Sequence, residues 1–112
     1  MEEPNRSNPF WRQGDIYFVK IGGDAEPAES KPVKNGVIAK GETTGHAHRL
    51  APSSMASGAL LYLVGRSMFL RSPETGTKIV HDEHHPIDLP PGLYAVVPQQ
   101  EFDGLRWRQV LD

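Results

Sequence analysis

Short runs of apolar and β-branched residues alternate along the chain with glycine- and proline-rich turns, and no stretch repeats its apolar residues at the helical spacing i, i+3, i+4, i+7. β-Branched and aromatic residues favour strands, whereas closely spaced glycines and prolines favour turns. The pattern therefore predicts a chain built almost wholly from β-strands, about seven in number. The predicted strands lie in residues 13–21, 37–50 (two strands joined at a glycine kink), 59–72 (a hairpin), the start of 77–89, 92–103 and 105–112.

A chain of 112 residues with this pattern has room for one hydrophobic core. We predict an all-β fold, a single small β-barrel or sandwich of about seven strands. Residues 1–10 hold two prolines among polar residues and are predicted to form a flexible N-terminal arm, and residues 11–112 to form the single β-domain. Residues 22–36 and 51–58 lack periodicity and are predicted to be loops. The turn of the 59–72 hairpin is expected at Gly65-Arg66.

The composition excludes several classes of protein. There is no cysteine, which excludes disulfides, thiolate metal ligands and a cysteine nucleophile. A net charge of −2 does not indicate a nucleic-acid partner, although it is compatible with a local basic patch. No apolar run approaches the roughly 20 residues of a membrane-spanning helix, and the acidic, polar start MEEPNRSNPF is unlike a signal peptide. We therefore expect no membrane partner and a cytoplasmic location.

All five histidines lie in two short segments, GETTGHAHRL (41–50) and VHDEHHPI (80–87). Alternate side chains of a strand point to the same face, so His46 and His48 would share a face with their Cβ atoms about 6.5–7 Å apart. This spacing lets two imidazoles reach one metal ion, with Ala47 facing away. The glycines before the pair would allow a tight backbone, and the threonines beside them would orient imidazole N–H groups.

The second segment leaves two arrangements open. An extended backbone would place His81, Glu83 and His85 on one face and the residues between them on the other. A turn before Pro86 would instead rotate His84 inward. In both arrangements one carboxylate joins the imidazoles, and the two segments are expected to be neighbours in space, with His46 within about 8 Å of His81 or His84.

These residues predict a divalent metal site. The candidate ligands, which are also the candidate catalytic residues, are His46, His48, His81, His84 and Glu83. A mixed set of nitrogen and oxygen ligands suits Zn, Mn, Fe or Ni, and the sequence does not choose among these cofactors. Glu83 is expected to be a fourth ligand or the base for a metal-bound water. Whether the site is catalytic stays open; a hydrolase of phosphodiesterase or nuclease type, acting on a phosphoester or another small polar substrate, is the expected enzyme class.

A metal-free alternative uses the same histidines. Two imidazoles with pKa values near neutrality can act as general base and general acid, as in the cleavage of RNA phosphodiesters. In that hypothesis the protein is a metal-independent nuclease, and a cationic side chain binds the phosphate of the nucleotide substrate. The candidate cations are Arg49, Arg66, Arg71 and Lys78.

Several segments together resemble one family of small, largely uncharacterised bacterial and phage β-proteins. They are RQGDIYFV, GETTGHAH, HDEHHPIDLPPGLYAVVPQQEF and RWRQVLD, which occur in this order over nearly all of residues 11–112. The corresponding family motifs are GExTGHxH and HxEH followed by IxLPxGxY, and Gln100 stands where the family has arginine. By matching positions, the resemblance implies a role for His46, His48, His81, Glu83 and His84 rather than His85.

A looser resemblance, carried by GETTGHAH and LPPGLY, is to the cupins, which are small β-barrels that hold a metal ion through an HxH pair, a Glu and a further His. No Glu follows His48 at the cupin distance, so the resemblance implies a histidine site inside a β-fold rather than cupin membership. A third hypothesis follows from the phage resemblance, that the chain is a non-enzymatic phage or host accessory protein that binds a partner through its exposed faces. Exposed strand edges favour association, so a homodimer is a further expectation.

Overall fold

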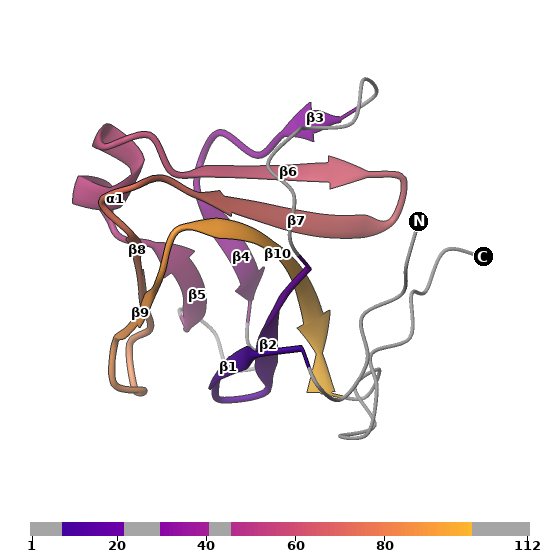
Figure 1. The fold of residues 1–112 in the computed structure, drawn as a ribbon. Coiled ribbons are helices and arrows are strands. Elements are labelled where there is room, and N and C mark those ends of the chain that lie inside the picture. Colours follow the sequence, from indigo (N-terminus) through magenta and orange to yellow (C-terminus); the bar gives the residue numbers. More distant parts are fainter. Residues whose placement is uncertain (1–7, 22–29, 41–45, 100–112) are drawn as a thin grey trace.

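The computed structural model describes residues 8–21, 30–40 and 46–99 (Figure 1). Within these ranges the chain forms ten strands and one short helix, joined by turns and loops. The elements are β1 (Phe10–Gln13), β2 (Ile16–Lys20), β3 (Lys31–Pro32), β4 (Val37–Lys40), β5 (Ala47–Leu50), α1 (Pro52–Ala56), β6 (Leu60–Val64), β7 (Ser67–Ser72), β8 (Thr77–Val80), β9 (Ile87–Leu89) and β10 (Gly92–Pro98).

The strands form two antiparallel sheets. The six-stranded sheet has the order β1-β2-β10-β7-β6-β3, and the four-stranded sheet has the order β4-β5-β8-β9. The prediction of an all-β fold is confirmed. Of the two predicted architectures, the described strands form a two-sheet arrangement and not a closed barrel.

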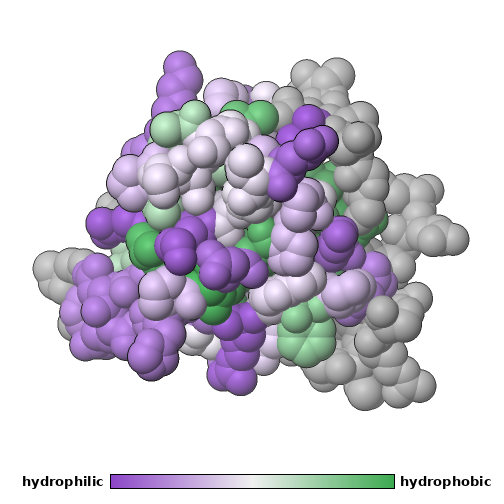
Figure 2. All heavy atoms as spheres, turned by 60° about the vertical axis from the view of Figure 1, so that its left-hand side comes forward, coloured by the Kyte–Doolittle hydropathy of each residue, from purple (hydrophilic) through white to green (hydrophobic). Residues whose placement is uncertain are grey.

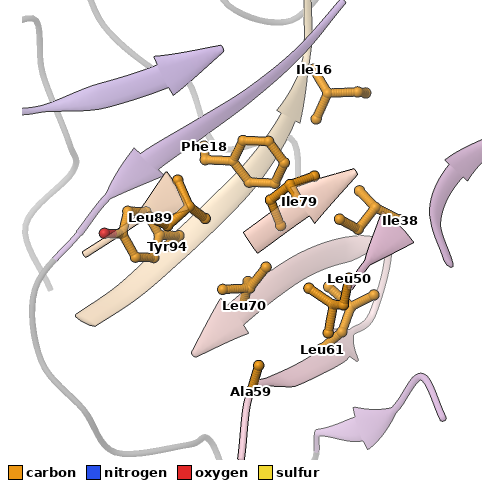
Figure 3. Close-up of a cluster of buried hydrophobic side chains, with 10 residues drawn as sticks. All are labelled: Ile16, Phe18, Ile38, Leu50, Ala59, Leu61, Leu70, Ile79, Leu89 and Tyr94. Atoms are coloured by element: carbon orange, nitrogen blue, oxygen red, sulfur yellow. The ribbon is translucent and has the colours of Figure 1, made fainter. Parts of the chain in front are cut away.

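The main core lies between the two sheets. Phe18 of β2, Leu70 of β7 and Tyr94 of β10 reach it from the larger sheet, and Ile79 and Leu89 reach it from the smaller one (Figure 3). All five side chains are at most 1% exposed. The Tyr94 hydroxyl donates a 2.6 Å hydrogen bond to the carbonyl of Pro90, and burial raises the pKa of this phenol to about 12, so it remains a donor.

The opposite face of the six-stranded sheet carries a second apolar cluster. Successive side chains of a strand point to opposite faces, so Leu93, Ala95 and Val97 of β10 contribute to this cluster, while Tyr94 contributes to the core between the sheets. The larger sheet therefore buries apolar residues on both faces. This explains why β10 is a nearly continuous apolar run.

Two segments differ from their predicted structure. The strand predicted at residues 13–21 lies mostly in the second arm of a hairpin, because Gly14 and Asp15 form a two-residue turn between β1 and β2. Such turns require a positive φ at their first residue, and Gly14 has φ +60°. The loop predicted at residues 51–58 contains helix α1, which begins at Pro52, where the missing N–H costs no helical hydrogen bond.

Of the other predicted elements, one hairpin is confirmed and several segments lie outside the described residues. The hairpin with its turn at Gly65-Arg66 is confirmed, since Val64 pairs with Ser67. The predicted strand 105–112, the end of 92–103 and most of the predicted N-terminal arm lie outside the described residues. More strands are present than the predicted seven, because the short strands β3 and β9 and the first hairpin give only a weak sequence pattern.

The face of the molecule shown in Figure 2 carries both hydrophilic and apolar side chains. No helix within the described ranges is long and apolar enough to cross a membrane. Figure 2, which brings the side of the β8–β9 hairpin forward, shows hydrophilic side chains gathered over much of this face, with smaller apolar areas between them.

The core predicts a large difference between two leucines of the β6–β7 hairpin. Leu70 is fully buried between the sheets, whereas Leu60 is 43% exposed. We expect Leu70→Ala to lower the free energy of unfolding by about 2–5 kcal/mol, because it leaves a cavity in the core. Leu60→Ala is the matched control and should cost less than about 1 kcal/mol. Urea denaturation followed by circular dichroism measures both changes, and equal losses would contradict this placement of the core.

Candidate histidine site

Three segments that are distant in the sequence meet at one end of the molecule. They are the β1–β2 turn, the start of β5 and the connection between β8 and β9 (Figure 1). Strands β5 and β8 are antiparallel neighbours, with Arg49 opposite Val80. Continuing this register by one residue places His48 opposite His81, and their ring centroids are 4.4 Å apart. The pairing of β5 with β8 thus joins the two histidine segments.

His48 is the buried centre of the cluster, with an exposed fraction of 3%. Its Nδ1 lies 2.9 Å from Oε1 of Gln13, and its Nε2 lies 3.3 Å from Oδ1 of Asp15. Burial lowers the pKa of His48, and the nearby His81 lowers it further, against the opposing effect of Asp15. His48 is therefore neutral at physiological pH.

The hydrogen bonds of Gln13 determine which nitrogen of His48 carries the proton. The Gln13 amide group donates to the carbonyls of Ile79 (3.1 Å) and His85 (2.9 Å), which can only accept. Oε1 of Gln13 therefore faces His48 as an acceptor, so Nδ1 of His48 is the donor. In the neutral ring this leaves the Nε2 lone pair directed toward Asp15.

His81 has the opposite arrangement. The backbone N–H of Glu83 donates a 2.9 Å hydrogen bond to Nδ1 of His81, so this nitrogen carries a lone pair and Nε2 carries the proton in the neutral ring. The same hydrogen bond turns the chain after β8. Of the two arrangements left open by the sequence, the extended backbone is wrong and the turn is correct.

This turn brings His84, not His85, into the cluster. The His84 ring lies 4.5 Å from the ring of His81 and 5.9 Å from that of His48, between ring centroids. It also packs over the β1–β2 turn, where a Cβ added to Gly14 would lie 2.6 Å from Nε2 of His84. His85 contributes its backbone carbonyl to Gln13 instead.

His46 and Glu83 lie at the outer side of the cluster. Nδ1 of His46 is 3.5 Å from Oε1 of Glu83, and the His46 ring centroid is 6.1 Å from that of His81. The expected proximity of the two histidine segments is therefore confirmed. The glycines and threonines of residues 41–45, which were expected to support the site, lie outside the described residues.

The structure brings all five predicted site residues together, although their side chains as oriented do not form a set of metal ligands. Within the described residues, no group of three or more His, Asp and Glu side chains is arranged to hold a metal ion. The arrangement offers a neutral, buried imidazole with a free lone pair, two further imidazoles beside it, and carboxylates at 3.3 Å and 3.5 Å from imidazole nitrogens.

Sequence reasoning from residue chemistry missed two members of the site, Gln13 and Asp15. A glutamine 35 positions from His48 has no distinctive chemistry in the sequence, and Asp15 follows a glycine as in many surface turns. The only signal was the RQGD segment, which contributed to the family resemblance but was interpreted as part of a strand.

Comparison with known proteins gives the family of this chain. A family profile described as a domain of unknown function, DUF8820, matches residues 12–99. The chain belongs to this family. The matched range of DUF8820 begins next to Gln13 and ends at Gln99, so it contains every residue of the histidine site. No curated protein and no solved structure matched the chain, and the cupin resemblance stays a prediction.

The close packing of His84 over the first hairpin turn leads to a test with two glycines. Gly14 and Gly65 occupy equivalent turns with φ +60° and +61°, but an added Cβ at Gly65 meets nothing within 4 Å. We expect Gly14→Ala and Gly65→Ala to cost similar stability, about 1–2 kcal/mol, from the positive φ. Only Gly14→Ala should displace the exposed His84 ring, as measured by the NMR shifts of the histidine rings. Unchanged His84 shifts in Gly14→Ala would contradict the contact.

The neutral state of His48 predicts a pH dependence of stability. The pKa of His48 is lower in the folded protein than its ordinary value of 6.5, so the unfolded chain takes up this proton first as the pH falls. The contribution of His48 to the free energy of unfolding is therefore complete above about pH 6.5 and is lost as the pH falls through the folded pKa. Urea denaturation between pH 5 and 8 should show a smaller loss in His48→Gln than in the wild type. His85→Gln, the control, should retain the wild-type slope.

Proposed function

We propose that the histidine site binds one divalent transition-metal ion, with His48, His81 and His84 as its nitrogen ligands. The observation that carries this proposal is the spacing of the three rings. Two imidazoles that bind an ion at about 2.1 Å have centroids about 4.5–5.2 Å apart at bond angles of 90–110°. The pairs His48–His81 and His81–His84 have separations of 4.4 Å and 4.5 Å, and His48–His84 has a wider one of 5.9 Å.

Burial and charge support the same proposal. Metal ions bind the neutral form of histidine, and His48 is held neutral by burial and by the neighbouring imidazoles. Its Nδ1–H is donated to Gln13, as metal-binding histidines donate their second nitrogen to a protein oxygen. Binding requires His81 to exchange its hydrogen bond with the Glu83 backbone, which rotation of this partly buried ring permits.

Carboxylates complete the proposed ligand set. Asp15 lies 3.3 Å from Nε2 of His48, and Glu83 lies 3.5 Å from Nδ1 of His46. Both side chains are largely exposed, at 75% and 65%, so they can move toward an ion. A set of imidazoles and carboxylates suits Zn, Mn, Fe or Ni. We place His46 and Glu83 outside the three-ring group, as a further ligand pair or as the groups that accept a proton from a bound water during hydrolysis of a phosphoester or another small polar substrate.

A second candidate function, metal-independent acid–base catalysis, is favoured by one specific observation. The two central rings have opposite tautomers, with a lone pair on Nε2 of His48 and a proton on Nε2 of His81. A general base therefore stands beside a proton donor, with ring centroids 4.4 Å apart. Arg49 follows His48 directly in β5, so its exposed side chain lies on the opposite face of the strand from His48. Arg66 lies in the β6–β7 turn, away from the site in Figure 1.

Adjacent histidines provide a matched test of the metal site. His84 and His85 are both exposed, but only the His84 ring lies in the cluster. We expect the metal-free wild type to bind one equivalent of Zn²⁺ in calorimetry, with a rise in melting temperature that EDTA reverses. Loss of a ligand in His84→Ala should weaken binding by about 100-fold or more, beyond the 10–100-fold effect of an outer-shell partner. His85→Ala should bind as the wild type does.

The same preparation distinguishes the two candidate functions. The titration is repeated with Mn²⁺, Ni²⁺ and, without oxygen, Fe²⁺. If none of the four ions binds, or if the His84 and His85 variants bind equally, the metal site is wrong. Cleavage of a model phosphodiester that persists in EDTA and is lost in His48→Gln would then support acid–base catalysis.

A further inference from the structure

Gln13 connects three separate parts of the site through one buried amide. It ends strand β1, is 2% exposed, and contacts His48 of β5, Ile79 of β8 and His85 of the β8–β9 connection. Both hydrogens of its NH₂ group are donated to carbonyls, so the amide cannot flip without placing its oxygen against two other oxygens. The orientation of Gln13 is therefore fixed by the backbone of a different sheet.

Two acceptors compete for the single proton of the neutral His48 ring. Oε1 of Gln13 requires the proton on Nδ1, and Oδ1 of Asp15 favours it on Nε2. Asp15 is 75% exposed and can be satisfied by water, whereas the Gln13 oxygen is buried and faces Nδ1. An unsatisfied buried polar group costs more than an exposed one, so the competition favours Gln13.

We propose that Gln13 is the positioning residue of the site, which holds His48 as the Nδ1–H tautomer and so directs the Nε2 lone pair toward Asp15 and the other imidazoles. Without Gln13, the proton of the neutral His48 ring would move to Nε2, where it gains a hydrogen bond to Asp15. Nε2 would then have no lone pair available for a ligand. Only the statement that this lone pair binds a metal ion rests on the proposed function. The tautomer itself is a property of the metal-free chain.

Two substitutions separate the positioning role from simple support of the fold. Gln13→Met is close in size and removes all three hydrogen bonds. Gln13→Glu also loses the donors to Ile79 and His85 but keeps an oxygen acceptor for Nδ1 of His48. An effect seen in both variants is caused by loss of the hydrogen bonds to the carbonyls of Ile79 and His85. An effect seen only in Gln13→Met is caused by loss of the oxygen that accepts from His48.

The readout is a long-range ¹H–¹⁵N correlation spectrum of the histidine rings in the ¹⁵N-labelled, metal-free full chain. We expect the Nδ1–H form of His48 in the wild type and in Gln13→Glu, and the Nε2–H form in Gln13→Met. Zn²⁺ affinity should fall about 10–100-fold in Gln13→Met, the range typical of partners that orient a ligand, and by less in Gln13→Glu.

Two results would overturn the proposal. One is an Nε2–H tautomer of His48 in the wild type, which decides the question even if Gln13→Met does not fold. The other is an unchanged tautomer in folded Gln13→Met. Failure of the metal site is separate from both results. If none of Zn²⁺, Mn²⁺, Ni²⁺ and Fe²⁺ binds to any of the three proteins while the tautomers follow the expected order, the metal proposal is wrong and the positioning role of Gln13 stands.

Discussion

The side-chain amide of Gln13 is the interaction on which the arrangement of the site depends. Its three hydrogen bonds join the first hairpin of the six-stranded sheet to β5, β8 and the β8–β9 connection of the four-stranded sheet. Each bond satisfies a group that would otherwise be buried without a partner, and the penalty for leaving such a group unsatisfied is about 1–3 kcal/mol. The adjacent Gly14 then allows His84 to pack over the turn, since any Cβ would occupy the space of its ring.

The hydrogen bonds of Gln13 are local contacts, and they can form only because the packing of the two sheets brings β1 close to β5 and β8. Phe18 and Tyr94 from the larger sheet meet Ile79 and Leu89 from the smaller one, and burial of their apolar surface holds the sheets together. Ile79 has a part in both, because its side chain lies in the core and its carbonyl accepts from Gln13. The histidine site therefore lies directly beside the hydrophobic core, where His48 is buried, whereas residues 82–86 of the β8–β9 connection are exposed.

The sequence predicts the fold class well because strand periodicity and turn residues are local signals. The β6–β7 hairpin shows this, because a short apolar run lies on each side of the turn residues Gly65-Arg66. The pairing of His48 with His81 depends on the register of β5 and β8, which the sequence does not encode locally. The choice of His84 over His85 depends on one backbone hydrogen bond to His81, and the role of Gln13 depends on contacts across the two sheets. Residue chemistry thus identified the imidazoles but not the groups that orient them.

A purely structural explanation accounts for only part of the cluster. His48 alone resembles an ordinary buried histidine, whose Nδ1–H is donated to Gln13 while its Nε2 faces the exposed carboxylate of Asp15. His81 and His84 need no such burial, yet their rings pack against it and each other at 4.4–5.9 Å. A group of three imidazole rings beside two exposed carboxylates is better explained by the ligand-binding role that we propose than by a contribution to the fold.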